Sequence, residues 1–336
     1  MRPGLPSGGW GSRQNFKNPK KHSRDRWYRL STVDVAAGLI KLLKDEEWHA
    51  LRGLEKCMIG GRSTNFDAIA RMSGQPAERT RFALDELNKR KLIGFAGENY
   101  VVYTSALDLL ALKHYADKDY AMALGKLIAK GKESDVYEVL SPNSELFALK
   151  LFRLGRTSFR DVKRKRSRSK DDSNTWVTSN YNAARHEFAA LLRLRKLTEN
   201  VPTAVDQDRH TVLLQELPGV RLSQRPELDD ADGILSVILR TAREAYTVSK
   251  MINGDLSEYN ILTDGRRVWL IDWPQWVGPT HPNAAELLGR DVFTVLRFFL
   301  RAYGVKVDDE RALRYVRGEV ESLKVRRARS STRGSG

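Results

Sequence analysis

The chain has 336 residues, of which 41% are hydrophobic and 30% are charged, and its single cysteine is Cys57. This length predicts two domains with a sizeable core, and no stretch approaches the roughly 18 uninterrupted apolar residues of a membrane span. One cysteine excludes an internal disulfide and a multi-cysteine metal site, and we interpret Cys57 as a buried structural residue. Because the first ten residues contain glycine and proline instead of an apolar signal core, we expect an intracellular, cytoplasmic protein with no membrane partner.

The formal charge of +16 is concentrated in three segments of the chain. Residues 1–29 and 156–170 each carry +7 and residues 324–336 carry +5, which leaves about −3 for the remainder. Basic clusters favour a polyanionic partner, and a ribosomal or other RNA surface is the natural intracellular one. The alternative interpretation is that these segments only keep the chain soluble.

The N-terminal third has the pattern of a winged helix preceded by an arm. Residues 1–29 lack apolar periodicity and predict a disordered basic arm. From Ser31, a good N-cap, apolar residues recur at helical spacing, and a second helix is expected over about 46–58. Residues 65–76 then give a helix, a glycine turn and a proline at the start of a new helix, which is a helix-turn-helix pattern.

The new helix is expected to turn Phe82, Leu84 and Leu87 toward the core. Residues 92–103 form two short apolar runs across a glycine turn and predict the hairpin, or wing, that completes a domain over 30–104. Such a domain usually contacts nucleic acid, although the same scaffold also docks proteins. A helical connector is expected to follow over 105–122.

The pattern then changes to strands, expected over 126–128, 136–140 and 146–152. Between the first two lies a turn with one glycine, whose backbone N–H groups and Ser134 hydroxyl suit a triphosphate. A lysine, Lys150, interrupts the third strand, and a buried lysine requires a carboxylate or phosphate partner. Glu187, in an expected helix over 183–197, is the candidate carboxylate. The alternative is an edge-strand lysine that reaches solvent.

Residues 156–180 form a basic insert that is too polar and too long for an ordinary turn. We expect a flexible loop that becomes ordered on nucleotide or on a large partner. A buried strand is predicted over 211–214, followed by a linker between two lobes over 215–219. The backbone of 214–217 is expected to bind an adenine edge.

Three polar residues further along the chain predict phosphoryl transfer. Asn260 follows Asp255 by five residues, and Asp272 ends the next apolar strand. In this chemistry one carboxylate orients the attacking hydroxyl, while the asparagine and the second carboxylate hold magnesium. Each residue alone is equally consistent with a turn or a strand end. Their spacing, together with Lys150 upstream, favours a site.

At this point the chain resembles a known family, the RIO atypical protein kinases, and specifically their winged-helix branch. The resemblance covers about 30–305. Its most specific blocks are 131–137 (GKESDVY), 149–151 (LKL) with 153–160 (RLGRTSFR), 254–260 (GDLSEYN), 271–275 (IDWPQ), and 281–284 (HPNA) with 290–292 (RDV).

The resemblance implies an α+β protein in which an N-terminal winged helix-turn-helix precedes a compact two-lobed RIO kinase-like fold. The lobes are expected over 123–214 and 215–318, with a basic disordered tail over 319–336. The family implies an ATP- and Mg²⁺-dependent serine kinase and ATPase, with Mn²⁺ as an alternative metal. It also implies a role in maturation of the small ribosomal subunit, with its rRNA contacted by the winged helix, arm and loop. We expect a monomer.

Residue by residue, the resemblance implies Asp255 as the catalytic aspartate and Asp272 as both a magnesium ligand and the candidate phosphoacceptor. Asn260 is the second magnesium ligand, and Lys150 is expected on the α and β phosphates. The nucleotide-binding set is Lys132, Glu133, Ser134, Val136, Lys150, Glu187, Gln215 and Leu217.

Three positions depart from the family pattern. Asn253 stands where a histidine is usual, so we expect altered loop positioning more than lost chemistry. Trp273 replaces a phenylalanine, and Ala129 replaces a glycine of the phosphate loop, where it affects close backbone approach to the phosphates. The Trp273 change is a tolerable aromatic exchange, whereas Asn253 and Ala129 motivate an alternative function, a nucleotide-loaded but catalytically weak factor in ribosome assembly.

Two further alternatives belong to other classes. A DNA-binding regulator would account for the winged helix and the basic arm, and it predicts sequence-selective duplex binding. A small-molecule kinase shares the spacing of Asp255 and Asn260. It leaves the winged helix and the block 131–137 unexplained.

Overall fold

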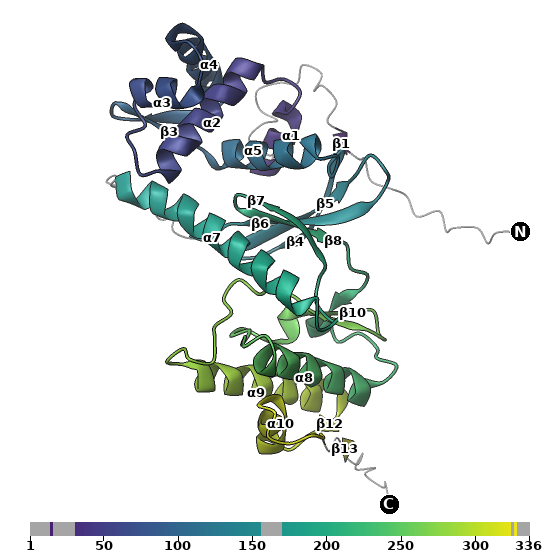
Figure 1. The fold of residues 1–336 in the computed structure, drawn as a ribbon. Coiled ribbons are helices and arrows are strands. Elements are labelled where there is room, and N and C mark those ends of the chain that lie inside the picture. Colours follow the sequence, from purple (N-terminus) through teal and green to yellow (C-terminus); the bar gives the residue numbers. More distant parts are fainter. Residues whose placement is uncertain (1–13, 16–30, 156–169, 324–325, 328–336) are drawn as a thin grey trace, which may run out of the picture. The chain divides into compact units, whose positions relative to one another are not determined.

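The computed structural model describes residues 14–15, 31–155, 170–323 and 326–327 (Figure 1). Most of the expected arm, the first part of the basic insert (156–169) and most of the expected tail beyond 323 lie outside the described residues. The chain divides into two compact units, one comprising residues 1–182 and 208–213 and the other comprising 183–207 and 214–336. Each unit is described by itself.

The first unit begins with the elements of a winged helix. Its helices and wing strands are α1 (Thr32–Leu39), α2 (Asp45–Ile59), α3 (Phe66–Ser73), α4 (Ala77–Lys89), β2 (Ile93–Ala96) and β3 (Asn99–Val102). Ser31 caps α1 in a capping box with Asp34, and Asn65 caps α3 by accepting from the backbone N–H of Ala68. Gly74, at φ +69°, ends α3 in the left-handed conformation that glycine adopts readily. The helix-turn-helix and the antiparallel wing are therefore confirmed.

One expectation about α4 is wrong, because Phe82 is 54% exposed. The buried residues of this helix recur at spacings of three and four, and they are Thr80, Ala83, Leu84 and Leu87. Leu84 and Leu87 thus face the core as predicted, while Phe82 lies outside the inward stripe. Cys57 of α2 is fully buried, and burial raises the pKa of its thiol, as fits a structural residue.

The rest of the first unit is the connector helix and a sheet. The connector α5 (Thr104–Asp117) leads into β4 (Ala123–Lys130), β5 (Ser134–Leu140) and β6 (Leu146–Phe152), which form an antiparallel meander. The sheet order is β1-β4-β5-β6-β8-β7, where β1 is Gln14–Asn15 and the hairpin strands are β7 (Ala204–Asp208) and β8 (Thr211–Gln215). The boundary between the two units passes through this hairpin and through helix α7.

Helix α7 (Lys170–Leu194) corrects the predicted extent of the basic loop. Residues 170–180 were expected in a flexible loop, and they are helical. Two contacts within the first unit explain the difference, because the indole of Trp176 donates to the carbonyl of Leu154 and the side chain of Asn180 accepts from the N–H of Leu154 at 2.8 Å. The polar composition of this stretch predicts a loop, but contacts with Leu154 stabilise a helix there.

The second unit is mainly helical around a small sheet. Its elements are β9 (Val220–Arg221), η2 (Leu222–Gln224), α8 (Ala231–Thr247), η3 (Glu258–Asn260), β10 (Ile261–Thr263), β11 (Val268–Leu270), α9 (Ala284–Tyr303), β12 (Val305–Lys306), α10 (Asp309–Val316) and β13 (Arg326–Arg327). Strands β11, β10 and β9 pair in that order. The apolar faces of α8 and α9 supply the core, which includes Leu235, Ile238, Val292 and Phe299. In the part of the chain that the structure describes, no helix is long and apolar enough to cross a membrane.

Candidate functional site

The residues predicted for phosphate binding lie in the first unit, around the turn between β4 and β5. The N–H of Gly131 donates to the carbonyl of Ser134 at 2.8 Å and closes this turn. Lys132 and Glu133 are exposed at its tip, and Ser134 begins β5. The turn therefore presents the polar side chains of Lys132 and Glu133 at an exposed tip, as suits a phosphate-covering loop.

Lys150 lies in β6 and is 6% exposed. It pairs in register with Val136 of β5, and its ammonium lies 4.9 Å from the ring centroid of Phe152. The buried lysine that the sequence predicted is present, so the edge-strand alternative is wrong. Its pairing with Glu187, which belongs to the second unit, stays a prediction.

The alanine at 129 belongs to strand β4, opposite Val136. The pairing of β4 and β5 is irregular just before this residue, and the tight turn starts only at Gly131. Ala129 is therefore a strand residue two positions before the turn, and its effect on the approach of phosphates stays a prediction.

In the second unit Asn253 joins the two predicted catalytic residues. Its side-chain Nδ2 donates to the backbone carbonyl of Asp272 at 3.0 Å, and its Oδ1 accepts from the backbone N–H of Asp255 at 3.1 Å. The side chain of Asn253 is buried, with 5% exposed. A short loop and the end of a strand, far apart in sequence, are thus held together by one amide.

The predicted magnesium ligand Asn260 lies beside Asp255. Its Nδ2 donates to the backbone carbonyl of Asp255 at 2.9 Å and to the carboxylate Oδ2 at 3.1 Å. The amide nitrogen is occupied in this way, which leaves the oxygen Oδ1 as the atom suited to a cation. The structure therefore brings Asp255 and Asn260 together as their spacing predicted.

A buried carboxylate with no role predicted from the sequence supports the same loop. Asp291 of α9 accepts from the backbone N–H of Gly254 at 2.7 Å and from that of Leu256 at 3.0 Å, the two amides that flank Asp255. Arg290 donates to the carbonyl of Gly254, whose φ of +81° suits glycine. Burial raises the pKa of Asp291 to about 6, although the two backbone hydrogen bonds act in the opposite direction.

Asp272 has a strained backbone, with φ +70° in a residue other than glycine. Such a conformation costs on the order of 1–3 kcal/mol and persists only where its neighbours hold it. Glu187 supplies one of those contacts, because its Oε1 accepts from the N–H of Trp273 at 3.3 Å. Trp273 is itself 1% exposed, and its indole donates to the carbonyl of Leu270 at 2.9 Å.

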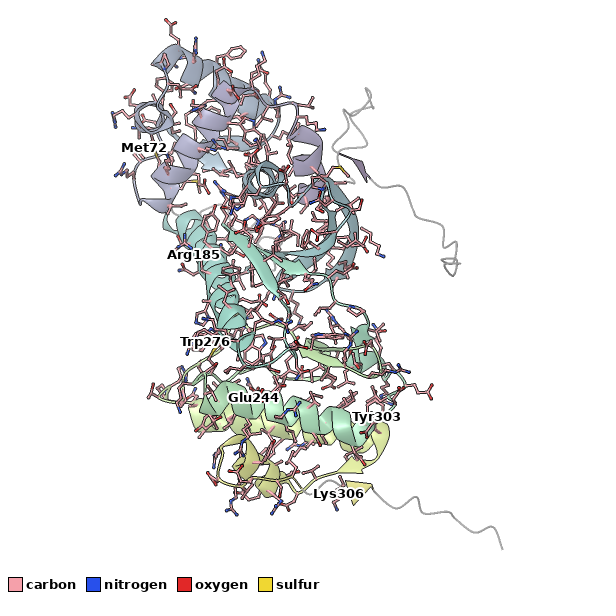
Figure 2. The ribbon with its side chains drawn as sticks, turned by 45° about the vertical axis from the view of Figure 1, so that its right-hand side comes forward. Met72, Arg185, Glu244, Trp276, Tyr303 and Lys306 are labelled. Carbon is pink, nitrogen blue, oxygen red and sulfur yellow. The ribbon has the colours of Figure 1, made fainter. Side chains whose placement is uncertain are left out.

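Helix α7 holds the next residues of the same segment through His186. The ring nitrogen Nδ1 of His186 lies 2.8 Å from the carbonyl of Pro274, and its ring stacks on Trp276 with centroids 4.5 Å apart and planes 5° apart. Trp276 is labelled in Figure 2. Arg193, on the same helix, lies 5.8 Å from the ring of Trp276 and donates to the carbonyl of Ser249 at 2.6 Å. His186 belongs to no motif in the sequence, so its role is visible only in the structure.

The predicted adenine-binding linker begins at the end of β8. The backbone N–H of Gln215 donates to the carbonyl of Thr203 at 2.9 Å, so this N–H belongs to the hairpin. An adenine edge would therefore meet the carbonyl of Gln215 and the backbone of Leu217. This role of the linker stays a prediction.

The donor atoms of the second unit suit magnesium. An amide oxygen from Asn260 and a carboxylate from Asp272 are hard oxygen ligands, the kind that Mg²⁺ prefers. No group of three or more His, Cys, Asp or Glu residues is arranged to hold a metal within the described residues. A small protein ligand set fits Mg²⁺, because this ion usually keeps several waters and takes further oxygens from a substrate phosphate.

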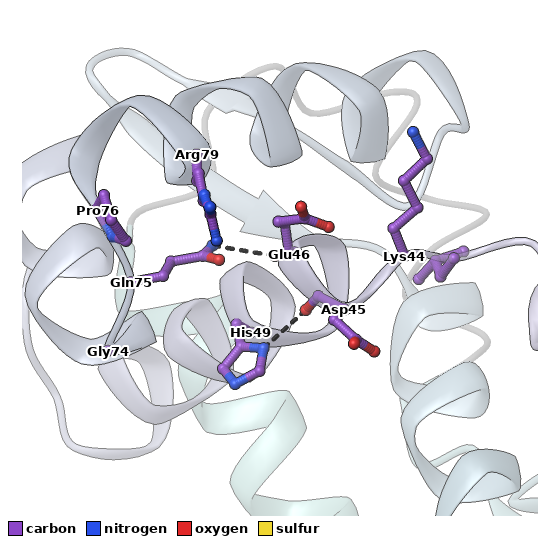
Figure 3. Close-up of a pocket in the computed structure, with 9 residues that line it drawn as sticks. Lys44, Asp45, Glu46, His49, Gly74, Gln75, Pro76 and Arg79 are labelled. Atoms are coloured by element: carbon purple, nitrogen blue, oxygen red, sulfur yellow. Dashed lines mark hydrogen bonds between the residues drawn. The ribbon is translucent and has the colours of Figure 1, made fainter.

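A polar pocket of about 680 Å³ lies elsewhere, in the winged helix (Figure 3). It is lined by the start of α2 and the α3–α4 turn, including Lys44, Glu46, His49, Gln75 and Arg79. Gln75 donates to the carbonyl of Glu46 at 3.0 Å, and His49 Nδ1 lies 2.7 Å from the carbonyl of Asp45. None of the residues predicted for phosphoryl transfer lines this pocket.

The family model and the similar proteins all belong to the RIO kinases. The RIO domain family model matches residues 135–312, more than half of the chain. The chain is 32% identical over 281 residues to the serine/threonine-protein kinase RIO2 of Caenorhabditis elegans, over 81% of this chain and 52% of that protein. It is 31% identical over 252 residues to the RIO-type serine/threonine-protein kinase Rio2 of Methanocaldococcus jannaschii, over 73% and 92%. The chain thus spans about half the length of the nematode relative.

A solved structure is similar in fold. It is the Rio2 kinase–ADP/Mg²⁺–phosphoaspartate complex from Chaetomium thermophilum, with a TM-score of 0.68 and 29% sequence identity over 79% of this chain and 83% of that one. The similarity confirms the predicted fold class, an α+β protein with an N-terminal winged helix followed by a RIO kinase-like fold.

Proposed function

The chain belongs to the RIO family of protein kinases, in its Rio2-type branch, and from this premise we propose that it transfers the γ-phosphoryl group of ATP. The proposed activity is that of a Mg²⁺-dependent serine/threonine kinase and ATPase, with Mn²⁺ as an alternative metal. The observation that carries the proposal is the double hydrogen bond of Asn253, which links Asp255 to Asp272.

Asp255 acts as the catalytic carboxylate in this proposal. In the kinase reaction it orients a serine hydroxyl and takes its proton as the oxygen attacks the γ-phosphorus. The bond from that phosphorus to the bridging oxygen breaks, and ADP leaves with the electron pair. The hydrogen bonds from Asn260 and the anchoring of both flanking amides by Asp291 support this role, because they restrict the position of Asp255.

The nucleotide-binding groups come from the chain's own basic and polar residues. Lys150 binds the α and β phosphates, and the turn carrying Lys132, Glu133 and Ser134 covers them. Asn260 Oδ1 and the Asp272 carboxylate would hold Mg²⁺, which supplies neutralisation of the phosphate charge. Val136, Glu187, Gln215 and Leu217 complete the proposed binding set.

An ATPase cycle through Asp272 is the second part of the proposal. The similar Chaetomium kinase was crystallised as an ADP/Mg²⁺–phosphoaspartate complex. In the corresponding step here, a carboxylate oxygen of Asp272 attacks the γ-phosphorus and ADP leaves. Water then attacks the acyl phosphate, Asp255 takes a proton from it, and inorganic phosphate departs. The strained backbone of Asp272 supports a functional role, because strain of this kind clusters at active sites.

Steady-state ATP turnover tests the proposal. Asp255→Ala and Asp272→Ala should each lose activity by at least about 100-fold, since each removes a group needed in the transition state. The matched control is Asp229→Ala, which breaks only an exposed ion pair with Arg266. Equal rates in all four proteins would exclude the proposed mechanism. Tight ATP binding without turnover by the unaltered protein would favour the catalytically weak assembly factor.

Radiolabelled ATP separates the kinase from the ATPase. Label on Asp272 would be an acyl phosphate that hydroxylamine releases, whereas phosphoserine survives this reagent. A hydroxylamine-labile label that disappears in Asp272→Asn supports the phosphoaspartate step. A stable label on serine in the unaltered protein supports kinase action alone.

The proposed partner is the maturing small ribosomal subunit and its rRNA, in the cytoplasm, as expected for the family. The basic segments 1–29, 156–170 and 324–336 support a polyanionic partner, and so do the exposed Arg79 and Arg81 on α4. Co-sedimentation with small-subunit precursors, but not with mature subunits, is the expected result. Sequence-selective binding to duplex DNA, well above the salt-dependent background, would favour the DNA-binding alternative instead.

A further inference from the structure

A buried ion pair lies where the connector helix meets the sheet of the first unit. Arg153 follows β6 and is 4% exposed, while Asp108 of α5 is fully buried. The guanidinium binds the carboxylate through two parallel hydrogen bonds, Nη1 to Oδ1 at 2.7 Å and Nη2 to Oδ2 at 2.9 Å. A bidentate pair fixes orientation as well as distance, so β6 and α5 are held in one relative position.

The same arginine also holds the turn between β4 and β5. Its backbone N–H donates to the carbonyl of Glu133 at 2.6 Å, and its Nε lies 3.6 Å from Oδ2 of Asp135. Asp135 directly follows Ser134 and is 6% exposed. Arg153 thus contacts the turn at two points, one through backbone and one through charge.

His210 completes this cluster. Its Nε2 lies 2.8 Å from Oδ1 of Asp108, and burial lowers the pKa of the imidazole, so the neutral ring donates to the carboxylate. Burial alone would raise the pKa of Asp108, yet the charge of Arg153 and the hydrogen bond from His210 hold it well below its usual range. One guanidinium charge therefore lies between the carboxylates of Asp108 and Asp135 in a site closed to water.

We propose that Asp108 and Arg153 are positioning residues for nucleotide binding, because they fix the phosphate-covering turn 131–135 to the connector helix. This inference rests on the proposed function, since the turn matters only if it covers a nucleotide. A turn that is held before binding loses less conformational entropy when its amides meet the phosphates. Releasing one or two residues of the turn should weaken nucleotide binding on the order of tenfold or more.

The pair also connects the turn to the winged helix. Helix α5 begins directly after wing strand β3 and packs against α1. Arg153 Nη2 reaches the hydroxyl of Thr32, the first residue of α1, at 3.4 Å. A single buried side chain therefore contacts the start of the winged helix, the connector and the phosphate turn.

Two variants of the Asp108–Arg153 pair distinguish an effect on nucleotide binding from an effect on stability. Asp108→Asn leaves Arg153 with its charge poorly compensated, so it is expected to lose both stability and nucleotide affinity. The double variant Asp108→Leu/Arg153→Met replaces the pair with apolar side chains, which often restores stability in a buried site. We expect the double variant to regain melting temperature and still bind nucleotide weakly.

A second buried pair in the same unit provides a matched control. Arg209 binds Glu55 of α2 through Nε to Oε1 at 2.6 Å and Nη2 to Oε2 at 2.8 Å. This pair joins the winged helix to the β7–β8 turn, and its further hydrogen bonds are to Tyr181 and Asp208. Glu55→Gln should therefore lower the melting temperature without changing nucleotide affinity.

The measurement is equilibrium binding of a fluorescent ATP analogue to the full chain, paired with thermal unfolding of each variant. Weaker binding by about tenfold or more in both Asp108 variants, with Glu55→Gln unchanged, supports the proposal. Affinity equal to that of the unaltered protein in the folded double variant overturns it. Affinity that follows melting temperature across all variants, Glu55→Gln included, also overturns it, because the effect would then be general stability. If the unaltered protein binds no nucleotide, the proposed function itself fails.

Discussion

Asn253 connects the two carboxylates of the proposed mechanism, since its Nδ2 donates to the carbonyl of Asp272 at 3.0 Å while its Oδ1 accepts from the N–H of Asp255 at 3.1 Å. Histidine is usual here in the family. An imidazole changes its donor and acceptor pattern with protonation, whereas an amide has a fixed donor and a fixed acceptor. The asparagine thus keeps the link between the two segments and makes it independent of pH.

Removing this amide should affect turnover more than folding. Asn253→Ala loses both hydrogen bonds, each worth about 0.5–1.5 kcal/mol. The loop and Asp272 then adopt their geometry less often, so we expect kcat to fall about 10- to 100-fold. Asn253→His retains a donor for Asp272 and should keep activity to within about tenfold near pH 8.

A matched control for this position is Asn143→Ala, in the exposed turn between β5 and β6. It should leave kcat unchanged. Steady-state ATP turnover of the three variants provides the check. Full activity in Asn253→Ala would show that the link is dispensable and that the loop is fixed by its other contacts, those of Asp291, Arg290 and Asn260.

Asp291 predicts an acid limit to activity. Its pKa of about 6 means that it is ionised at pH 8 and protonated at pH 5. Protonation converts one acceptor oxygen to a hydroxyl, so the carboxyl no longer accepts from both Gly254 and Leu256. We expect kcat to fall as pH decreases through about 6. Asp291→Asn should be less active at pH 8 and lack this acid limb, whereas the same limb in the variant would assign it to another group.

The stability linkage of Asp291 has the opposite sign from that of an ordinary ion-paired carboxylate. Its folded pKa of about 6 lies above the ordinary value of 3.8, so its contribution is fully present below about pH 3.8 and is lost as pH rises through 6. The loss is about 3 kcal/mol at most, from roughly two pKa units. Chemical unfolding at pH 5 and pH 8, with Asp291→Asn as the comparison, covers the upper part of this range, so about half of the loss should appear between the two pH values.

Much of the fold follows from sequence because its signals are local. Ser31 and Asn65 cap their helices, Gly74 ends one, and strands β4, β5 and β6 include the ranges predicted for strands. The start of α7 was missed because Trp176 and Asn180 bind Leu154, a contact that helical propensity does not encode. Phe82 was wrongly predicted to face the core for another reason. In a short helix several choices of the buried face fit the apolar pattern about equally well.

The parts of the site that could be predicted are those whose residues are close together in the sequence. Asp255 and Asn260 are five positions apart, across a short loop and the 3-10 helix η3, and they lie side by side, while Lys150 is buried because its strand is apolar. His186 was not predictable, because its partners lie about 90 residues away in sequence. Asp291 did have a signal, an acid within the apolar stripe of α9, and that pattern indicates a buried carboxylate with backbone partners.

His186 predicts a change in metal dependence. The segment after Asp272 is held by its stacking on Trp276 and its hydrogen bond to Pro274. Each contact is worth about 0.5–1.5 kcal/mol. His186→Ala should free the segment, so that the Mg²⁺ concentration for half-maximal turnover rises by about tenfold. The exposed His49→Ala, in the winged helix, serves as control, and an unchanged Mg²⁺ requirement in His186→Ala would show that the stack does not position Asp272.

Trp273 predicts a separation of stability from activity. The side chain is 1% exposed and donates to the carbonyl of Leu270 at 2.9 Å, whereas its link to Glu187 uses only the backbone N–H. Trp273→Ala should therefore cost about 3–5 kcal/mol of unfolding free energy. Trp273→Phe should cost about 1–2 kcal/mol, for the lost hydrogen bond and a small void, and should remain active. Urea unfolding with Phe82→Ala as the control measures both, since Phe82 is 54% exposed and its loss should change stability by less than about 0.5 kcal/mol. An inactive but stable Trp273→Phe would show that the indole contributes to the site directly.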